Sequence, residues 1–284
     1  MQNIINGLPI AAVILLLAVG FAFLVKGADF FVEGSSSIAK KLKVPPIIIG
    51  LTIVAMGTSL PETAVSVTAS LVQNNELAVS NVVGSNIFNL MFVIGVCSIL
   101  TPIMVQKATV VRDIPLSLGC ALLLLVLGIS GLGDKAGMTL GHADGIIFLI
   151  VFAGYIFTMV RSAMKARAAG QKVEIEGVEE CDNMKELSYG KSILFLIVGA
   201  AAIAFGGDLT VDTASRIAIE LGMSQTLVGL TIVSIGTSLP ELVTSVVAAR
   251  KNEVDMAVGN AIGSNIFNIL MVLGISYSIS PVAL

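Results

Sequence analysis

The sequence predicts an all-α polytopic membrane protein built from inverted repeats of transmembrane helices. Its 284 residues are 56% hydrophobic and only 12% charged, whereas about 25% of the residues of soluble globular proteins are charged. The apolar residues form long runs, and one six-residue motif, GTSLPE, occurs twice, at 57–62 and 236–241. These features place most of the chain in a lipid bilayer. The net charge of −3 and the absence of a basic patch argue against a nucleic-acid partner.

Eight apolar runs are long enough to cross a hydrocarbon core of about 30 Å, which takes roughly 20 helical residues. They lie at 8–31, 45–72, 78–101, 108–130, 143–162, 190–212, 224–249 and 257–280. Residues 1–10 carry no Lys or Arg, so the first run is expected to remain as a membrane span and not to be removed as a secretory signal. The sequence therefore predicts eight spans.

Basic residues predict the orientation of these spans in the cell membrane, because short cytoplasmic loops are enriched in Lys and Arg. With eight alternating crossings, one side receives only Lys135 and Arg216. The opposite side receives nearly all the others, namely Lys40, Lys41, Lys43, Lys107, Arg112, the six from Arg161 to Lys191, Arg250 and Lys251. We therefore expect the N-terminus outside and the basic side in the cytoplasm.

A hydrophilic segment separates two unequal halves of the chain. Residues 1–162 hold five predicted spans and residues 189–284 hold three, while residues 163–188 carry mixed charge without apolar periodicity. We interpret 163–188 as a solvated cytoplasmic linker. Its carboxylates leave a regulatory ion site conceivable, but their spacing matches no EF-hand loop.

The two halves contain related segments. GLTIVAMGTSLPE at 50–62 and GLTIVSIGTSLPE at 229–241 are identical at 11 of 13 positions, with an offset of 179 residues. At the same offset, NVVGSNIFN at 81–89 aligns with NAIGSNIFN at 260–268. An odd number of spans precedes the second repeat, so the two repeats, 45–101 and 224–280, enter the membrane from opposite sides. Inverted repeats are common in secondary transporters, whose substrate sites lie near the midplane between the repeats.

The second half has no counterparts of the spans at 108–130 and 143–162. We expect a shortened chain in preference to a natural arrangement of five plus three spans. The reason is that a repeat without two of its spans leaves one flank of a pseudo-symmetric bundle exposed.

Each GTSLPE motif places an acid beside a proline inside an apolar span. Burying an ionised carboxylate at mid-membrane costs at least a few kcal/mol, so Glu62 and Glu241 require a partner or a ligand, and neither span offers a Lys or Arg at that depth. Pro61 and Pro240 break or kink the helix, because proline lacks an amide hydrogen. The break frees backbone carbonyls, which are tolerated at membrane depth only where protein, water or an ion satisfies them.

Polar side chains recur at helical spacing around both acids. Thr58 and Ser59 precede Glu62 by four and three residues, and the second motif repeats this spacing. In the following spans two stripes recur every four residues, Asn81, Ser85 and Asn89, and Asn260, Ser264 and Asn268. These residues supply carboxylate, amide, hydroxyl and carbonyl oxygens but no thiolate or imidazole. Such a set of ligands suits a hard cation, above all calcium.

The cysteines and the histidine are interpreted as structural. Cys97, Cys120 and Cys181 lie far apart without metal-binding spacing, and we expect them to be inert packing residues. His142, the only histidine, falls at the start of a predicted helix that Asp144 can cap. No metal-ligand role is predicted for His142.

Several polar residues near the motifs are interpreted as structural or stay open. Asp29 and Asp208 lie toward the ends of predicted spans, where capping or interfacial roles are expected, and Lys26 can pair with Asp29. Asn86 and Asn265 lie beside the two stripes, where packing and direct coordination stay equally open.

The paired GTSLPE segments, each followed by GSNIFN, resemble the two alpha-repeats of the sodium/calcium exchanger family, within the calcium/cation antiporter superfamily. The resemblance covers residues 10–280 and implies a ten-helix fold of inverted repeats, here without its last two helices. Carried over residue by residue, it implies an ion site formed by Thr58, Ser59, Glu62, Ser85, Asn89, Thr237, Ser238, Glu241 and Ser264, together with carbonyls near Ala55 and Ser234. Asn268 completes the set, although some prokaryotic members have Asp at the matching position.

The resemblance implies a secondary active antiporter that exchanges calcium for sodium by alternating access, with both ions as substrates, no cofactor and no enzymatic activity. The alternatives are proton-coupled or potassium-dependent exchange. The superfamily's proton-coupled branch usually carries a different repeat, which favours sodium. An intramembrane hydrolase is a different class, and it lacks a histidine or lysine beside Ser59 or Ser238 to act as a base. A non-transporting fragment is the remaining alternative.

Overall fold

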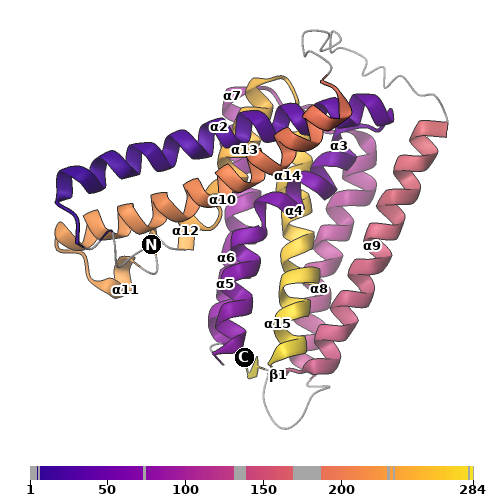
Figure 1. Ribbon diagram of the computed structural model, residues 1–284. Coiled ribbons are helices and arrows are strands. Elements are labelled where there is room, and N and C mark those ends of the chain that lie inside the picture. The colour runs from indigo at the N-terminus through magenta and orange to yellow at the C-terminus, as the bar shows by residue number, and fades with distance from the viewer. Residues whose placement is uncertain are drawn as a thin grey trace.

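The computed structural model describes residues 5, 7–72, 75–130, 139–168, 187–228, 231–232, 234–280 and 282–283. Apart from loops, these residues are helical, with one short antiparallel pair of strands, β1 (Thr139–Leu140) and β2 (Val282–Ala283). The predicted all-α class is thereby confirmed. The β1–β2 pair ties the start of one long helix to the C-terminal end of the described chain (Figure 1).

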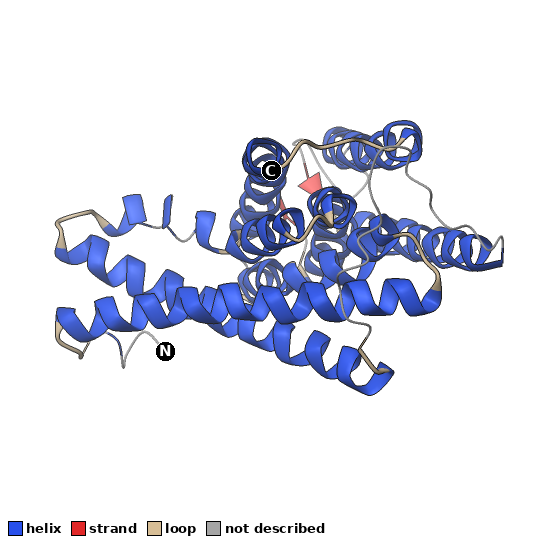
Figure 2. Ribbon diagram, turned by 90° about the horizontal axis from the view of Figure 1, so that it is seen from above, coloured by secondary structure: helices blue, strands red, loops and turns tan. Residues whose placement is uncertain are grey.

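Two long helices, α2 (Ile10–Leu42) and α10 (Tyr189–Glu220), cross the bundle side by side and antiparallel (Figures 1 and 2). Their backbones approach closely along a seam of small residues, spaced by seven positions on each helix. A Cβ atom added to Gly27 would lie 2.9 Å from the Ile203 nitrogen, and one added to Gly199 would lie 2.7 Å from the Phe31 nitrogen. Small residues allow this contact between helices where lipid offers no hydrophobic driving force.

The bundle contains two sets of shorter helices with matching boundaries. The first set is α3 (Pro46–Ile49), the π-helical η1 (Gly50–Val54), α4 (Ala55–Thr58), α5 (Leu60–Leu71), α6 (Asn75–Phe88), the π-helical η2 (Asn89–Val93) and α7 (Ile94–Leu100). The second set is α11 (Gln225–Val228), α12 (Ser234–Gly236), α13 (Leu239–Arg250), α14 (Val254–Phe267), the π-helical η5 (Asn268–Val272) and α15 (Leu273–Ile279). From α5 onward every boundary recurs 179 residues later, which is the offset of the sequence repeat. The insertion of the two repeats from opposite sides of the membrane stays a prediction.

Two further helices cover the second repeat. The π-helical η3 (Thr109–Asp113) leads into α8 (Ile114–Ser130), and α9 (His142–Ala168) packs along α15. A Cβ atom added to Gly145 would lie 2.6 Å from the Ser278 nitrogen, so α9 and α15 touch backbone to backbone. The most apolar stretch of Val254–Ile279 is 89% buried, against 33% for its repeat counterpart Glu76–Leu100. The span α14–η5–α15 is therefore the centre of the described bundle.

Most of the predicted spans are present. Among the described residues six helices are long and apolar enough to cross a membrane, and the pair Pro46–Thr58 and Leu60–Leu71, bent by 48°, passes the same criteria when its two helices are taken together. The remaining predicted span, 224–249, includes residues outside the described ranges. The linker predicted at 163–188 lies largely outside them as well, although α9 continues to Ala168.

The helix that contains the apolar run at 8–31 is longer than that run, because α2 continues to Leu42. The added turns are rich in serine, but Ser37 is buried against α10, where it accepts a hydrogen bond from Ser192 at 2.9 Å. Asp29 consequently lies within a helix and not at its end, so a capping role is wrong, and an interfacial role stays a prediction. Its predicted partner Lys26 is confirmed at 3.6 Å.

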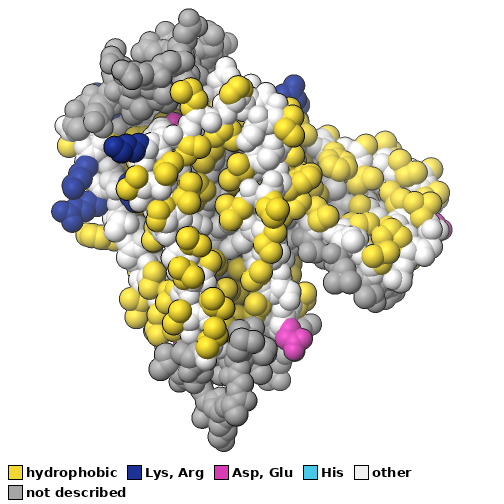
Figure 3. Space-filling model, turned by 180° about the vertical axis from the view of Figure 1, so that it is seen from behind, with side chains coloured by type: hydrophobic (Ala, Val, Ile, Leu, Met, Phe, Trp, Pro, Cys, Tyr) yellow, Lys and Arg dark blue, Asp and Glu magenta, His cyan; other side chains and the backbone are white. Residues whose placement is uncertain are grey.

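The outer surface of the bundle is apolar (Figure 3). Large hydrophobic side chains cover the exposed face of α6 to α9, including Met91, Ile99, Leu118, Ile129 and Phe157. In Figure 3 the Lys and Arg side chains appear near the upper end of the bundle. An apolar belt of this kind belongs in lipid and not in water, so the chain is an integral membrane protein.

Candidate ion-binding site

The site begins at a helix break that occurs once in each repeat. Ser59, between α4 and α5, has φ −83° and ψ 11°, and Ser238, before α13, has φ −91° and ψ 4°. The proline of each motif follows its serine by two residues. It lies in the first turn of the new helix, where its missing amide hydrogen costs no hydrogen bond. The break places Glu62 and Glu241 in the first turns of α5 and α13, and both side chains are fully buried.

Glu62 is bound by hydroxyl groups from both repeats. Its Oε1 accepts from Ser85 of α6 at 3.3 Å and from Ser238 at 3.2 Å. The two serines also contact each other, with an Oγ–Oγ distance of 2.9 Å. The first acid is therefore joined to the helix break of the second repeat.

Glu241 has the same pair of contacts with the repeats exchanged. Its Oε1 accepts from Ser59 at 3.0 Å and from Ser264 of α14 at 3.4 Å. Thr58 lies on this side as well, 3.4 Å from the Ser264 hydroxyl and hydrogen-bonded to Asn260 Oδ1 at 3.0 Å. Each acid thus depends on one serine from its own repeat and one from the other.

Four buried oxygens in this region lack any hydrogen-bond partner within the described chain. They are Glu62 Oε2, Glu241 Oε2, Asn89 Oδ1 and Asn268 Oδ1. All four residues are 0% exposed. A buried acceptor without a donor costs about 1–3 kcal/mol, and more when it is charged. These four oxygens, from two carboxylates and two amides, are acceptors that the described chain leaves unsatisfied.

Within the described ranges no Lys, Arg or His side chain pairs with either acid. The ion pairs of the described residues join Lys26 and Lys251 to Asp29, Arg112 to Asp113, and Arg216 to Glu220. None of these pairs includes Glu62 or Glu241, and the two carboxyl groups are close enough to interact electrostatically. The described chain also contains no cluster of three or more His, Cys, Asp or Glu side chains. The region therefore holds two carboxylates among otherwise neutral oxygens, without a cationic side chain from the described residues.

Asparagine side chains close the site on one side. Asn86 Nδ2 donates to the Asn265 carbonyl, and Asn265 Nδ2 donates to the Asn86 carbonyl, both at 3.2 Å. Asn89 donates to Asn265 Oδ1 at 3.2 Å, and Asn268 donates to Asn86 Oδ1 at 3.1 Å and to Ser85 at 3.1 Å. These bonds use the amide nitrogens of Asn89 and Asn268, so their Oδ1 atoms are turned away from the asparagine cluster.

The structure brings the ten predicted site residues into one buried region, and their role as ligands stays a prediction. Eight of them are hydrogen-bonded to another member of the set, while Asn89 and Thr237 are bonded to the neighbouring Asn265 and Asn81. The Ala55 carbonyl accepts from Thr58 Oγ1 at 3.3 Å and from the Ser59 amide at 3.0 Å. The side chain of Ser234 lies outside the described part of the chain.

Three pairs of supporting residues were missing from the predicted set. Asn86 and Asn265 had been left open between packing and coordination, and here they bond to each other and to Asn89 and Asn268. Asn81 and Asn260 hold the serines four residues beyond each acid, Ser66 at 3.1 Å and Ser245 at 2.9 Å. That i+4 spacing after Glu62 and Glu241 was a signal in the sequence that could have identified both serines.

Among the residues interpreted as structural, His142 and Asp144 have hydrogen-bond partners. Cys97 and Cys120 are buried free thiols, and Cys181 lies outside the described residues. His142 Nδ1 lies 3.1 Å from the Ser278 carbonyl, and Asp144 accepts from the Gly141 amide at 2.8 Å. Asp208 is exposed on α10, away from the helix ends.

The fold and the site together define an integral membrane protein of the secondary-transporter class, with a buried oxygen-rich region between two repeats. The chain belongs to the sodium/calcium exchanger protein family, whose model matches residues 12–161 and 191–284. It is 35% identical over 292 residues to the sodium/calcium exchanger MaX1 of Methanosarcina acetivorans, which covers 95% of this chain and 83% of that protein. It is 37% identical over 269 residues to the inner membrane protein YrbG of Escherichia coli, with 94% and 79% covered.

Solved structures agree with this membership. A crystal structure of the sodium-calcium exchanger NCX_Mj, soaked with Na⁺ and Ca²⁺, superposes with a TM-score of 0.77 at 31% identity. The superposition covers 96% of this chain and 83% of that one. Fold and family are therefore shown for nearly the whole chain.

Proposed function

We propose that the protein exchanges Ca²⁺ for Na⁺ across the membrane and that both ions bind between the two helix breaks. The observation that carries this proposal is the set of four buried, unpartnered oxygens on Glu62, Glu241, Asn89 and Asn268. Oxygen-only ligands with two carboxylates suit Ca²⁺, which accepts six to eight oxygens in a flexible cage. The names of the family and of MaX1 support the same pair of ions.

The charge of the site explains how the two fluxes are coupled. Two buried carboxylates are neutralised by one divalent ion or by monovalent ions, and ionised carboxylates left without a cation in low dielectric are costly. The site holds calcium or sodium but not both. The protein changes the membrane face to which the site is open only when the site is occupied. Exclusive occupancy therefore converts the gradient of one ion into transport of the other.

Alternating access follows from the inverted repeats, in which the two helix breaks exchange roles as the site opens to one face and then to the other. The reciprocal contacts of Glu62 and Glu241 support this mechanism, since each acid is held by the break of the other repeat. We further propose that the protein lies in the plasma membrane with its N-terminus outside and residues 163–188 in the cytoplasm.

The test is calcium uptake into proteoliposomes loaded with sodium, compared with vesicles loaded with choline. We expect uptake only when sodium is inside, and uptake that ignores the sodium gradient contradicts the proposal. A pH gradient in place of the sodium gradient separates proton-coupled exchange, and potassium added on the sodium side tests for potassium dependence.

A further inference from the structure

The turn that precedes the ion site in the first repeat is π-helical. Residues Gly50–Val54 of η1 lead directly into α4, whose Ala55 carbonyl and Thr58 hydroxyl lie at the site. A π-helical turn is a rare local widening of a helix and is found mostly at functional positions. The placement of α4 relative to Glu241 therefore depends on how η1 is held.

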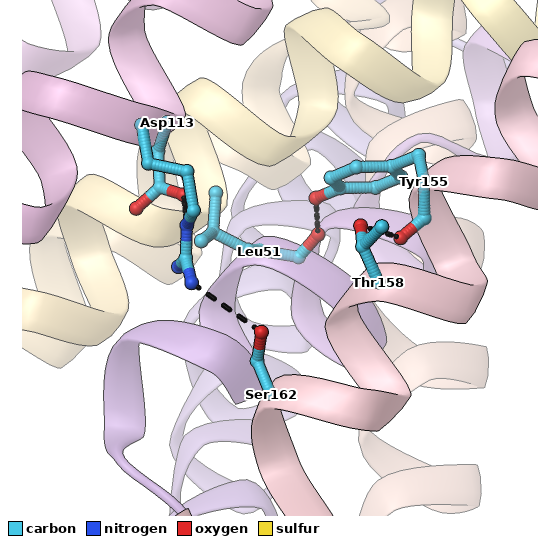
Figure 4. A network of polar contacts seen from close by, with 6 residues as sticks. Leu51, Asp113, Tyr155, Thr158 and Ser162 are labelled. Atoms are coloured by element: carbon cyan, nitrogen blue, oxygen red, sulfur yellow. Dashed lines mark hydrogen bonds and ion pairs between the residues drawn. The ribbon is translucent and has the colours of Figure 1, made fainter. Parts of the chain in front are cut away.

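One carbonyl of η1 is held from outside its own helix. The Tyr155 hydroxyl of α9 donates to the Leu51 carbonyl at 2.7 Å, across 104 residues of sequence (Figure 4). Tyr155 is 4% exposed and Leu51 is 0% exposed. This is a short, buried hydrogen bond between α9 and the turn that carries the site.

The backbone of Leu51 also packs closely against α14. A Cβ atom added to Gly259 would lie 3.0 Å from the Leu51 nitrogen, and one added to Gly263 would lie 2.8 Å from its Cα. The backbone of Leu51 is thus held both by the glycine face of α14 and by the Tyr155 hydroxyl. Of these two contacts, the bond from Tyr155 is the one made by a single side-chain hydroxyl.

The ring of Tyr155 is itself fixed in place. It packs edge-on against Phe267 at a centroid distance of 6.3 Å and lies 6.5 Å from Phe152. Nearby, Arg112 of η3 bonds both Asp113 and Ser162, which joins η3 to α9 beside the tyrosine (Figure 4). The hydroxyl is therefore presented to Leu51 by a rigid support.

We propose that Tyr155 is a positioning residue for ion binding: by holding the Leu51 carbonyl it fixes η1, and through η1 it aligns the Ala55 carbonyl and the Thr58 hydroxyl with the ion. The proposal rests on the proposed cation site. Tyr155 itself makes no contact with the acids among the described hydrogen bonds, so its effect passes through the backbone from Leu51 to Thr58.

The test compares Tyr155→Phe with Thr158→Val. Both changes remove one hydroxyl from α9, but the Thr158 hydroxyl bonds only the Tyr155 carbonyl of its own helix, at 2.7 Å. The calcium KM and the maximal rate of uptake are measured in sodium-loaded proteoliposomes, and the thermal midpoint is measured on the purified protein. We expect Tyr155→Phe to raise the calcium KM about threefold to tenfold, as for one lost buried hydrogen bond. The maximal rate should stay close to that of Thr158→Val, whereas the midpoint should fall because the Leu51 carbonyl loses a buried donor.

A double-mutant cycle supplies the second measurement. Calcium binding by calorimetry is recorded for Tyr155→Phe combined with Thr58→Val and, as the matched control from the other repeat, with Thr237→Val. We expect Tyr155→Phe and Thr58→Val to be non-additive, and Tyr155→Phe and Thr237→Val to be additive.

An unchanged calcium KM in Tyr155→Phe, an equal change in Thr158→Val, or additivity with Thr58→Val overturns the inference. Failure of the proposed function is distinguishable from these results, because the wild-type protein would then show no calcium uptake driven by sodium and no calcium binding.

Discussion

Asn86 and Asn265 donate their side-chain amides to each other's backbone carbonyls, at 3.2 Å in both directions. The two residues are 179 positions apart, and such a reciprocal pair is what a two-fold axis between two similar units produces. Their Oδ1 atoms accept from Asn268 and Asn89 with the same reciprocity. The pair marks the line where the two repeats meet, and it orients two of the four unpartnered oxygens of the site.

Loss of this asparagine pair is expected to destabilise the fold. Asn265→Ala removes one donor and leaves the Asn86 carbonyl and the Asn89 amide without their partner, at a cost of about 1–3 kcal/mol. The thermal midpoint in detergent should fall clearly below that of Ser98→Ala, since the exposed Ser98 bonds only within its own helix. Equal midpoints for Asn265→Ala and Ser98→Ala would argue against a stabilising pair.

Neutralising either acid is expected to abolish transport. Glu62→Gln or Glu241→Gln removes half of the negative charge that balances a divalent ion, while the hydrogen bonds of the site can still form around the amide. Calcium uptake and sodium-driven calcium release are measured beside Glu76→Gln, whose side chain is exposed at the start of α6. Retained calcium transport in either site variant contradicts the assignment of the two acids.

The serines of the two helix breaks should have matched effects. Ser59→Ala and Ser238→Ala each remove one hydrogen bond to the acid of the other repeat, at 3.0 Å and 3.2 Å. A hydrogen bond to a charged group contributes about 1.5–3 kcal/mol, so the calcium KM should rise at least tenfold in each variant. Ser80→Ala, at an exposed position of α6, is the control. Wild-type calcium affinity in both serine variants would contradict the claim that these reciprocal hydrogen bonds support calcium binding.

A single ion pair connects α2 to the end of α13, between Asp29 Oδ1 and Lys251 Nζ at 3.3 Å. The repeat counterparts are Asp208 and Val72, so the chemistry of this contact is present in only one repeat. Both side chains are partly exposed, at 32% and 26%, and Lys251→Gln should therefore cost no more than about 1 kcal/mol. The decrease in thermal midpoint caused by Lys251→Gln should be smaller in high salt. Lys26→Gln is the control because Lys26 is 75% exposed, and a larger effect of that change would contradict the expectation.

The helix content, the two related segments and the identity of the acids were determined by the sequence alone. Hydropathy reveals spans because each backbone polar group in lipid must be satisfied within its helix. An acid next to a proline in an apolar run identifies itself because burial of an unpaired charge is so costly. The set of ten predicted site residues came from the resemblance of the two repeats to the family's motifs, with Glu62 and Glu241 at its centre.

Only the tertiary structure decided which groups meet. Ser59 serves Glu241 and not the Glu62 of its own motif, and Asn86 faces Asn265, because the repeats are packed against each other with their helix breaks exchanged. Helical spacing relates residues along one helix, whereas these contacts join residues about 180 positions apart. The length of α2 was also decided by the tertiary structure. Its serine-rich end is polar by composition and becomes buried only against α10. The bond from Tyr155 to Leu51 has no signal in the sequence, because a backbone carbonyl carries no residue type and its exposure depends on the widened turn of η1.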